Sequence, residues 1–285
     1  MKTSMGIIYI CTGAYSVFWD DFYCSFEKYF MAEYEKHYYL FTDNEKLLTI
    51  VDDRIHVYRI ENQPWPLITL LRFGTFLKQE EAMKKHDFLM FSNANIVCCR
   101  MIEPQEILPD REKGETLFFT QHPGYCNKKP WNTPLDRNKR SHAYVPYCGG
   151  DTYVIGAFFG GYTAEFLKMT HTLNERVCED LKQGIIARWH DESHINHYII
   201  GRKGIKIISP EYCYPVGALE IKGEKKIAAV SKSDKFDVNT FKGFYKEQET
   251  SRIKSRIKRV EKMLEPMKIY FFVIRDFLLK RKKAV

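Results

Sequence analysis

The chain has 285 residues, 45% of them hydrophobic, and a formal net charge of +8. The charge is uneven: residues 252–285 carry 12 Lys and Arg against three acidic residues, which leaves residues 1–251 at −1 and excludes a nucleic-acid binder with a basic folded body. No apolar run is long enough to span a membrane, and the eight cysteines, with no C-x-x-C pair and no secretory signal, indicate free thiols in a reducing cytoplasm.

The first predicted element is a buried strand over residues 5–11, followed by a tight turn at Thr12 and Gly13. Ligands of α/β sheets bind beyond the carboxyl ends of strands, so Thr12, Gly13 and Tyr15 are candidates for contacting a nucleotide. The sequence contains neither G-x-G-x-x-G nor a P-loop, which removes support for a dinucleotide or P-loop ATP site.

Strands and helices then alternate, which predicts an α/β fold. Helical spacing covers residues 18–30 and 69–85, the second helix carrying Arg72 near its start. Strands are predicted at residues 36–43, 54–60, 87–91 and 116–120, and another helix at 165–182.

Asn93-Ala94-Asn95 follows the strand at 87–91, and we expect both asparagines on the same side of the strand end. Carboxylates at this place would hold a divalent cation, whereas neutral amides are weaker ligands for a hard cation. We therefore predict no essential metal. The alternative is an Asx turn that closes the strand.

Two further segments lie between the strand at 116–120 and the last helix. Residues 127–140 are rich in Lys, Pro and Asn and are predicted to form a surface loop. In the run 151–161, the small residues at 156, 157, 160 and 161 allow a ligand to approach the backbone closely.

Residues 189–198, Trp-His-Asp-Glu-Ser-His-Ile-Asn-His-Tyr, concentrate the groups that perform chemistry. On a helix the three histidines share one face and the carboxylates of Asp191 and Glu192 point elsewhere. The histidines either bind a metal, although the H-E-x-x-H arrangement is absent, or pack beside carboxylates that serve a polar substrate. A buried structural helix is the third alternative.

Six motifs in one order, Tyr9–Gly13, Trp65-Pro66-Leu67, Asn93-Ala94-Asn95, His122–Tyr125, Phe158–Gly161 and Trp189–His194, resemble glycosyltransferase family 6. That family contains the blood-group A and B transferases, the α1,3-galactosyltransferase and shorter bacterial homologues. The resemblance covers about residues 5–220. The Asn-x-Asn motif is similar to the bacterial, metal-independent branch, where mammalian members have Asp-x-Asp and manganese.

The resemblance implies a GT-A fold that transfers Gal or GalNAc from a UDP-sugar, with retention and in an α1,3 linkage, to a terminal galactoside. Glu192 matches the catalytic glutamate, Asp191 and Arg72 match groups that hold the donor sugar, and no metal or other cofactor is expected. Retention agrees with a carboxylate placed opposite the leaving group. The predicted donor site comprises Ile10, Thr12, Tyr15, Arg72, Asn93, Ala94, Asn95, Ile155, Gly156, Ala157 and Asp191, and the predicted acceptor site His122, Tyr125 and Trp189.

Donor choice is predicted from Ile155 and Ala157. In the family, Gly at the position of Ala157 makes room for an acetamido group and Ala favours galactose, so we expect UDP-Gal, with UDP-GalNAc as the alternative. Without a metal, the leaving UDP needs cationic partners, and Lys232 or Lys235 can supply one by closing over the donor. Solvation at the surface is the alternative, and the more ordinary role, for either lysine alone. A non-catalytic glycan-binding protein is disfavoured because Asp191 and Glu192 are both present.

We therefore expect a catalytic domain at residues 1–222, a polar linker at 223–251 and a basic amphipathic tail at 252–285. The tail ends in four consecutive basic residues, Lys280 to Lys283, and suits adsorption to an anionic membrane. The alternative is a terminal helix docked on the body or on a dimer partner. With no N-terminal anchor expected, the prediction is a cytoplasmic protein, peripheral on the inner membrane face, that modifies a lipid-linked glycan.

Overall fold

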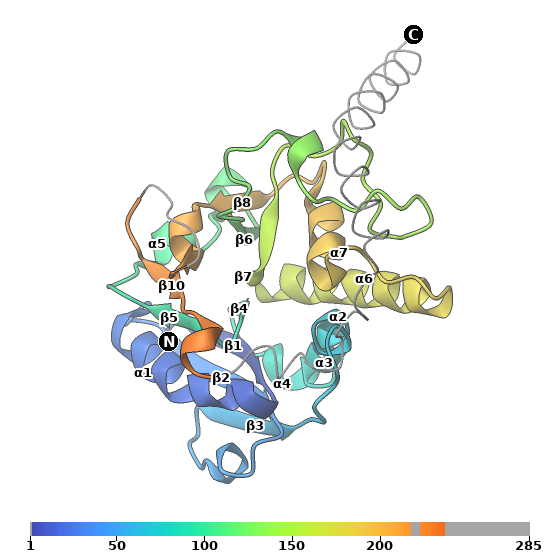
Figure 1. The fold of residues 1–285 in the computed structure, drawn as a ribbon. Helices are drawn as coiled ribbons and strands as arrows, with labels where there is room; N and C mark the ends of the chain where they lie inside the picture. The colour runs from blue at the N-terminus through green and yellow to red at the C-terminus, as the bar shows by residue number, and fades with distance from the viewer. Residues whose placement is uncertain (1, 218–222, 237–285) are drawn as a thin grey trace.

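The computed structural model describes residues 2–217 and 223–236, so the predicted tail, about half of the predicted linker and residues 218–222 of the predicted catalytic domain lie outside the described residues. A seven-stranded sheet in the order β3-β2-β1-β4-β7-β6-β8 forms the centre (Figure 1). Six strands run in one direction and β7 runs against both of its neighbours. The strands are β1 Ser4–Cys11, β2 Glu35–Thr42, β3 Ile55–Arg59, β4 Phe88–Ser92, β6 Leu117–Gln121, β7 Val154–Tyr162 and β8 Ile205–Ile208.

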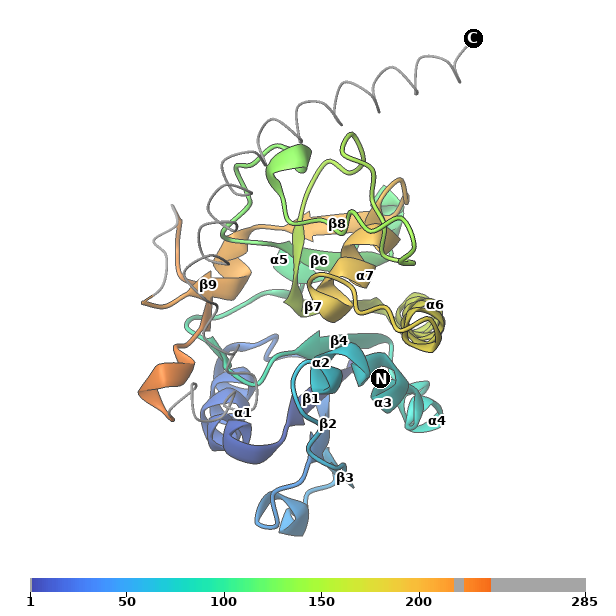
Figure 2. The ribbon, with the colours of Figure 1, turned by 45° about the vertical axis from the view of Figure 1, so that its right-hand side comes forward.

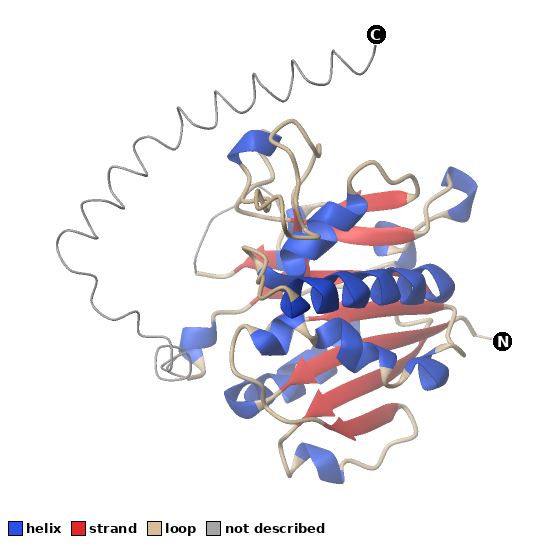
Figure 3. Ribbon diagram, turned by 90° about the vertical axis from the view of Figure 1, so that its right-hand side faces the viewer, coloured by secondary structure: helices blue, strands red, loops and turns tan. Residues whose placement is uncertain are grey.

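Helices cover both faces of this sheet, as Figures 2 and 3 show from two sides. α1 (Trp19–Tyr29) lies on one face, and α3 (Arg72–Leu77), α6 (Thr163–Lys182) and α7 (His190–Ile199) lie on the other. The period of two along β1 explains the layers, since Tyr9 packs with Phe22 of α1 while Ile8 packs in the cluster that contains Phe73 and Phe166. The prediction of an α/β fold is confirmed.

A second sheet joins distant parts of the chain in the order β5-β10-β9. Its strands are β5 Ile96–Cys98, β9 Tyr214–Pro215 and β10 Ile227–Ala229, and β10 runs antiparallel to β5. The sheet therefore ties the last described segment to the chain just after Asn93-Ala94-Asn95. The remaining elements are η1 Gly13–Phe18, η2 Leu47–Thr49, α2 Leu67–Leu70, α4 Glu80–Met83, α5 Pro104–Ile107, η3 Arg111–Lys113, η4 Pro130–Asn132, η5 Pro210–Cys213 and η6 Lys232–Asp234.

Two structural predictions were wrong. The single helix expected at 69–85 is three short helices, α2, α3 and α4, with breaks at Leu71 and at residues 78–79, because α2 packs on α7 while α3 packs on α6. The loop at 127–140 is not all surface. Residues 133–136 are buried, and Leu135 packs with Val145 and Tyr153.

The glycines at the end of β7 also serve the fold. A Cβ at Gly160 would lie 2.6 Å from the Leu89 carbonyl oxygen, and one at Gly161 would lie 2.4 Å from that of Thr116. These two glycines therefore allow the neighbouring chain segments at Leu89 and Thr116 to approach β7 closely. No helix in the described ranges is long and apolar enough to cross a membrane.

Candidate active site

The reversed direction of β7 creates the site. Its first residues lie at the edge where β4 and β6 end, and backbone hydrogen bonds join the three segments there. The Asn93 amide donates to the Ala157 carbonyl at 2.8 Å, and the His122 amide donates to the Tyr153 carbonyl at 2.9 Å. Segments predicted separately to bind the donor and the acceptor thus meet at one edge.

Glu192, in the first turn of α7, is held by both carboxylate oxygens. The Tyr153 hydroxyl donates to Oε1 at 2.6 Å, and the Gly156 amide donates to Oε2 at 2.9 Å. Burial raises the pKa of Glu192 to about 7, although both hydrogen bonds favour the charged form and oppose that rise. A carboxyl group with this pKa can change its protonation state near neutral pH.

Asp191 precedes Glu192 on α7 and points in a different direction, toward Arg72. Their side chains form a buried ion pair, with Arg72 3% and Asp191 6% exposed. Burial lowers the pKa of Arg72 and raises that of Asp191, and the attraction between the two charges opposes both shifts. Arg72 also donates to the Gly156 carbonyl at 2.7 Å and lies over the Phe91 ring.

The backbone of Gly156 joins the two carboxylate groups, because its N–H donates to Glu192 and its C=O accepts from Arg72, the ion-pair partner of Asp191. A Cβ there would lie 2.9 Å from Arg72 Nη2 and 3.0 Å from Asp191 Oδ2. Close packing of the site therefore depends on glycine at this position.

The three histidines of α7 lie in different surroundings. His190 contacts the Trp65 ring edge-on at 4.8 Å, buried His194 lies 3.6 Å from Asp180, and His197 Nδ1 lies 2.6 Å from the Tyr144 carbonyl oxygen. They pack and form polar contacts with separate neighbours. In residues 2–217 and 223–236, no group of three His, Cys, Asp or Glu side chains is placed to hold a metal ion.

On the acceptor side, the rings of His122, Tyr125 and Tyr153 form a cluster that we call the aromatic trio, with centroids 4.8 to 5.6 Å apart. Burial lowers the pKa of His122 to about 4, so its imidazole is neutral at pH 7. Trp189, the other predicted acceptor contact, is 45% exposed beside the carboxylates. An exposed indole suits stacking on a sugar ring.

The asparagine motif lies under the last described segment. Asn95 Nδ2 donates to the Val230 carbonyl at 2.7 Å, whereas Asn93 is partly exposed and Ala94 accepts a hydrogen bond from Tyr9. Asn95 therefore holds the chain two residues before Lys232.

The two predicted lysines have different environments. Lys232 lies 5.1 Å from the centre of the Tyr15 ring, and burial lowers the pKa of its ammonium. Lys235 forms an exposed ion pair with Asp21 of α1 at 3.0 Å. Lys232 is therefore partly buried and is not simply a solvated surface lysine, which is the more ordinary expectation for either residue.

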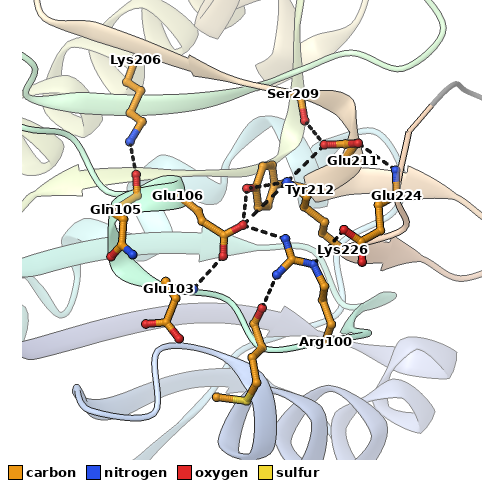
Figure 4. A network of polar contacts seen from close by, with 11 residues as sticks. Arg100, Glu103, Gln105, Glu106, Lys206, Ser209, Glu211, Tyr212, Glu224 and Lys226 are labelled. Atoms are coloured by element: carbon orange, nitrogen blue, oxygen red, sulfur yellow. Dashed lines mark hydrogen bonds and ion pairs between the residues drawn. The ribbon is translucent and has the colours of Figure 1, made fainter.

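A network of charges fastens this segment to the body (Figure 4). Lys226 lies 3.3 Å from Glu211 and 3.7 Å from Glu106, and Arg100 contacts Glu106 at 2.8 Å and Glu224 at 3.2 Å. The start of β10 is thereby tied to α5 and η5, which sets the path of the chain toward Lys232.

Comparison with known proteins identifies the family. The sequence model of glycosyltransferase family 6 matches residues 1–238. The chain belongs to glycosyltransferase family 6. It is 36% identical over 231 residues to the O-antigen biosynthesis glycosyltransferase WbnI of Escherichia coli, covering 81% of this chain and 94% of that protein.

Animal members of the family are also similar. Histo-blood group ABO system transferase 2 of Rattus norvegicus is 32% identical over 220 residues, which cover 75% of this chain and 64% of the rat protein. Globoside alpha-1,3-N-acetylgalactosaminyltransferase 1 of Homo sapiens is 30% identical over 228 residues, covering 75% and 62%. The chain thus spans less than two thirds of these two animal relatives.

The other predicted donor residues of this family 6 protein lie along the same edge of the sheet, at the end of β1 and the start of β7. Thr12 is buried and donates to Asn62 at 3.0 Å, Ile10 and Ile155 are partly buried, and Ala157 is 5% exposed. Tyr15 lies against Phe236, with ring centres 5.3 Å apart. The functions of these residues in donor binding remain predictions.

Two residues of this family 6 site were missed from the sequence. Tyr153 binds Glu192, and Asn196 binds both polar groups of the Val154 backbone, at 2.9 and 2.8 Å. Asn196 follows Glu192 by one helical turn, which is the only sequence signal that links it to the site. Tyr153 gave none, because its bond to Glu192 spans 39 residues.

Proposed function

We propose that this family 6 enzyme transfers galactose from UDP-Gal to a terminal galactoside, in an α1,3 linkage, with retention and without a divalent metal, on a GT-A fold. The observation that carries the proposal is the Glu192 carboxylate, held at both oxygens beside the buried Arg72 and Asp191 pair. A fixed carboxylate suits the positive charge that develops at the anomeric carbon when UDP leaves.

The leaving group requires the opposite charge. Lys232, partly desolvated beside Tyr15, is the cation that we assign to the UDP phosphates, and a bound diphosphate would favour its charged form. Asn93 and Asn95 would flank the diphosphate by hydrogen bonding. The residues present therefore supply charge compensation from the protein itself.

The acceptor is assigned to the aromatic trio and Trp189. During transfer the bond between the anomeric carbon and the UDP oxygen breaks, and a bond to the acceptor hydroxyl oxygen forms on the same face. The acceptor proton leaves with the phosphate. The name of the E. coli relative, an O-antigen biosynthesis glycosyltransferase, supports a bacterial surface glycan as acceptor.

The second candidate donor is UDP-GalNAc, which the names of the globoside transferases support. The test measures UDP release from each donor in EDTA, with lactose or fucosyllactose as acceptor and with Glu192→Gln as the inactive control. We expect acceptor-dependent turnover of UDP-Gal that survives EDTA. Turnover restored only by manganese, or faster turnover of UDP-GalNAc, would contradict the corresponding part of the proposal.

For localisation we propose attachment of residues 252–285 to the inner membrane face. The support is the sequence charge of that segment. Replacing Lys280, Arg281, Lys282 and Lys283 by Gln in the full chain is expected to abolish sedimentation with anionic vesicles. Undiminished sedimentation would refute the proposal.

A further inference from the structure

Tyr153 lies between the Glu192 carboxylate and the segment that carries the predicted acceptor contacts His122 and Tyr125. It immediately precedes β7 and is 1% exposed. Its hydroxyl donates to Glu192 at 2.6 Å, and its carbonyl accepts from the His122 amide at 2.9 Å. One residue therefore joins the carboxylate to the segment that carries the predicted acceptor contacts.

The other charged and titratable groups around Glu192 do not replace this bond. Arg72 of α3 points to Asp191, and Cys213 of η5 has its pKa raised to about 12 by burial, so its thiol is neutral. Across the described ranges, 2–217 and 223–236, Tyr153 is the one side chain that donates a hydrogen bond to Glu192.

The ring of Tyr153 is also fixed. It packs against Tyr125 at 5.3 Å and His122 at 5.6 Å, and Leu135 and Val145 cover it from the buried part of the loop. A tyrosine held at its ring, its carbonyl and its hydroxyl leaves Glu192 Oε1 little freedom to rotate. Such support by a neighbouring group is what precise positioning of a reactive group requires.

We propose that Tyr153 is a positioning residue, which orients Glu192 for sugar transfer and links its carboxylate to occupancy of the aromatic trio by the acceptor. The proposal rests on the function proposed above. A galactoside against His122 and Tyr125 presses on the two rings that hold the Tyr153 ring and so fixes the bond from its hydroxyl to Glu192, and the carboxylate is best oriented when an acceptor is present.

The test uses Tyr153→Phe in the full chain, which removes one oxygen and keeps the ring. The matched control is Tyr38→Phe. Tyr38 lies on β2, outside the site, is as buried as Tyr153, and donates a hydrogen bond to Glu27 at 2.8 Å. Two readouts are measured: the pKa of Glu192 by ¹³C carboxyl NMR, assigned with Glu192→Gln, and the pH dependence of kcat for transfer.

Loss of a hydrogen bond to the charged form raises a carboxyl pKa, so we expect Tyr153→Phe to raise the pKa of Glu192 by about one pH unit. The acid limb of kcat should move by the same amount, kcat at pH 6 should fall about tenfold, and donor hydrolysis should rise relative to transfer. Tyr38→Phe should change neither. In the wild type, lactose should lower the pKa of Glu192.

The outcomes separate the two proposals. An unchanged pKa of Glu192 in Tyr153→Phe overturns the positioning role, whether or not the protein transfers galactose, because the NMR titration needs no turnover. Should Tyr153→Phe fail to fold, the lactose titration of the wild type decides, and an unaltered pKa there overturns the link to the acceptor. Wild type that binds UDP-Gal and transfers no sugar contradicts the proposed function alone.

Discussion

Replacing Glu192 by Gln is expected to abolish transfer and to change how stability depends on pH. The carboxyl has a pKa of about 7 in the folded protein and an ordinary value of 4.5. Between these values the folded state binds more protons than the unfolded state, so the contribution of Glu192 to stability is present below pH 4.5 and is lost as the pH rises through 7. Glutamine does not titrate, so residue 192 of the variant does not lower the free energy of unfolding as the pH rises.

The magnitude follows from the two pKa values. Their difference corresponds to about 3 kcal/mol, and partial exposure of the side chain reduces our expectation to about 2 kcal/mol. At pH 5 the variant should be less stable than wild type by about 1 kcal/mol, because its amide NH₂ cannot accept from both Tyr153 and Gly156. At pH 8 it should be more stable by about 1 kcal/mol.

Urea unfolding of both proteins at pH 5 and pH 8 measures this difference. The buried histidines His86 and His194, whose pKa values burial lowers to about 4, destabilise both proteins equally as the pH falls below 6.5. Their contribution therefore cancels in the comparison. Stability curves that stay parallel between the two pH values would refute the assignment of a raised pKa to Glu192.

Three further perturbations test the donor side. Ala157→Gly should raise the use of UDP-GalNAc relative to UDP-Gal by about tenfold, measured as the ratio of kcat/KM for the two donors, and an unchanged ratio would argue against this position as the selector. Lys232→Ala should lower kcat about 100-fold, whereas Lys113→Ala, an exposed control, should not, and equal rates would remove Lys232 from the mechanism. Lys226→Met should raise KM for UDP-Gal several-fold at nearly constant kcat, because it removes the cation that joins Glu211 and Glu106 and so loosens β10; a drop confined to kcat would contradict that explanation.

Much of the fold could be predicted from local patterns. Uninterrupted apolar runs mark strands that are buried on both faces, and the strands predicted up to residue 120 agree with β1 to β4 and β6 within a few residues. The direction of β7 could not be predicted, since its residues 154–162 fit a parallel or an antiparallel strand equally well. The broken helix at 67–83 was missed because contacts with α6 and α7, which are distant in sequence, decide where it bends.

The site residues likewise fall into those that the sequence indicates and those that only the folded structure reveals. Asp191 and Glu192 were found because residues 189–198 concentrate two carboxylates, three histidines and an indole, and the role of Arg72 came only from the family resemblance. The structure brings Arg72 and Asp191 together across 119 residues. Tyr153 and Asn196 were missed because nothing in their immediate neighbours distinguishes them from packing residues, and only the meeting of β7 with α7 reveals their partners.

One residue of β7, Gly156, explains why the start of this strand must lie at the edge where β4 and β6 end. The backbone of Gly156 binds Glu192 through its N–H and Arg72 through its C=O, so the cation proposed to hold the donor sugar and the carboxylate proposed to act in transfer are fixed to the same strand. Gly156→Ala would place a Cβ 2.9 Å from Arg72 Nη2 and force the ion pair with Asp191 to move. A displacement near 1 Å is expected to lower kcat/KM for transfer about 100-fold. Gly184→Ala meets no neighbour within 4 Å and should only lose about 1 kcal/mol of stability through backbone strain, so equal activity of the two variants would show that the Gly156 peptide does not set the geometry of the site.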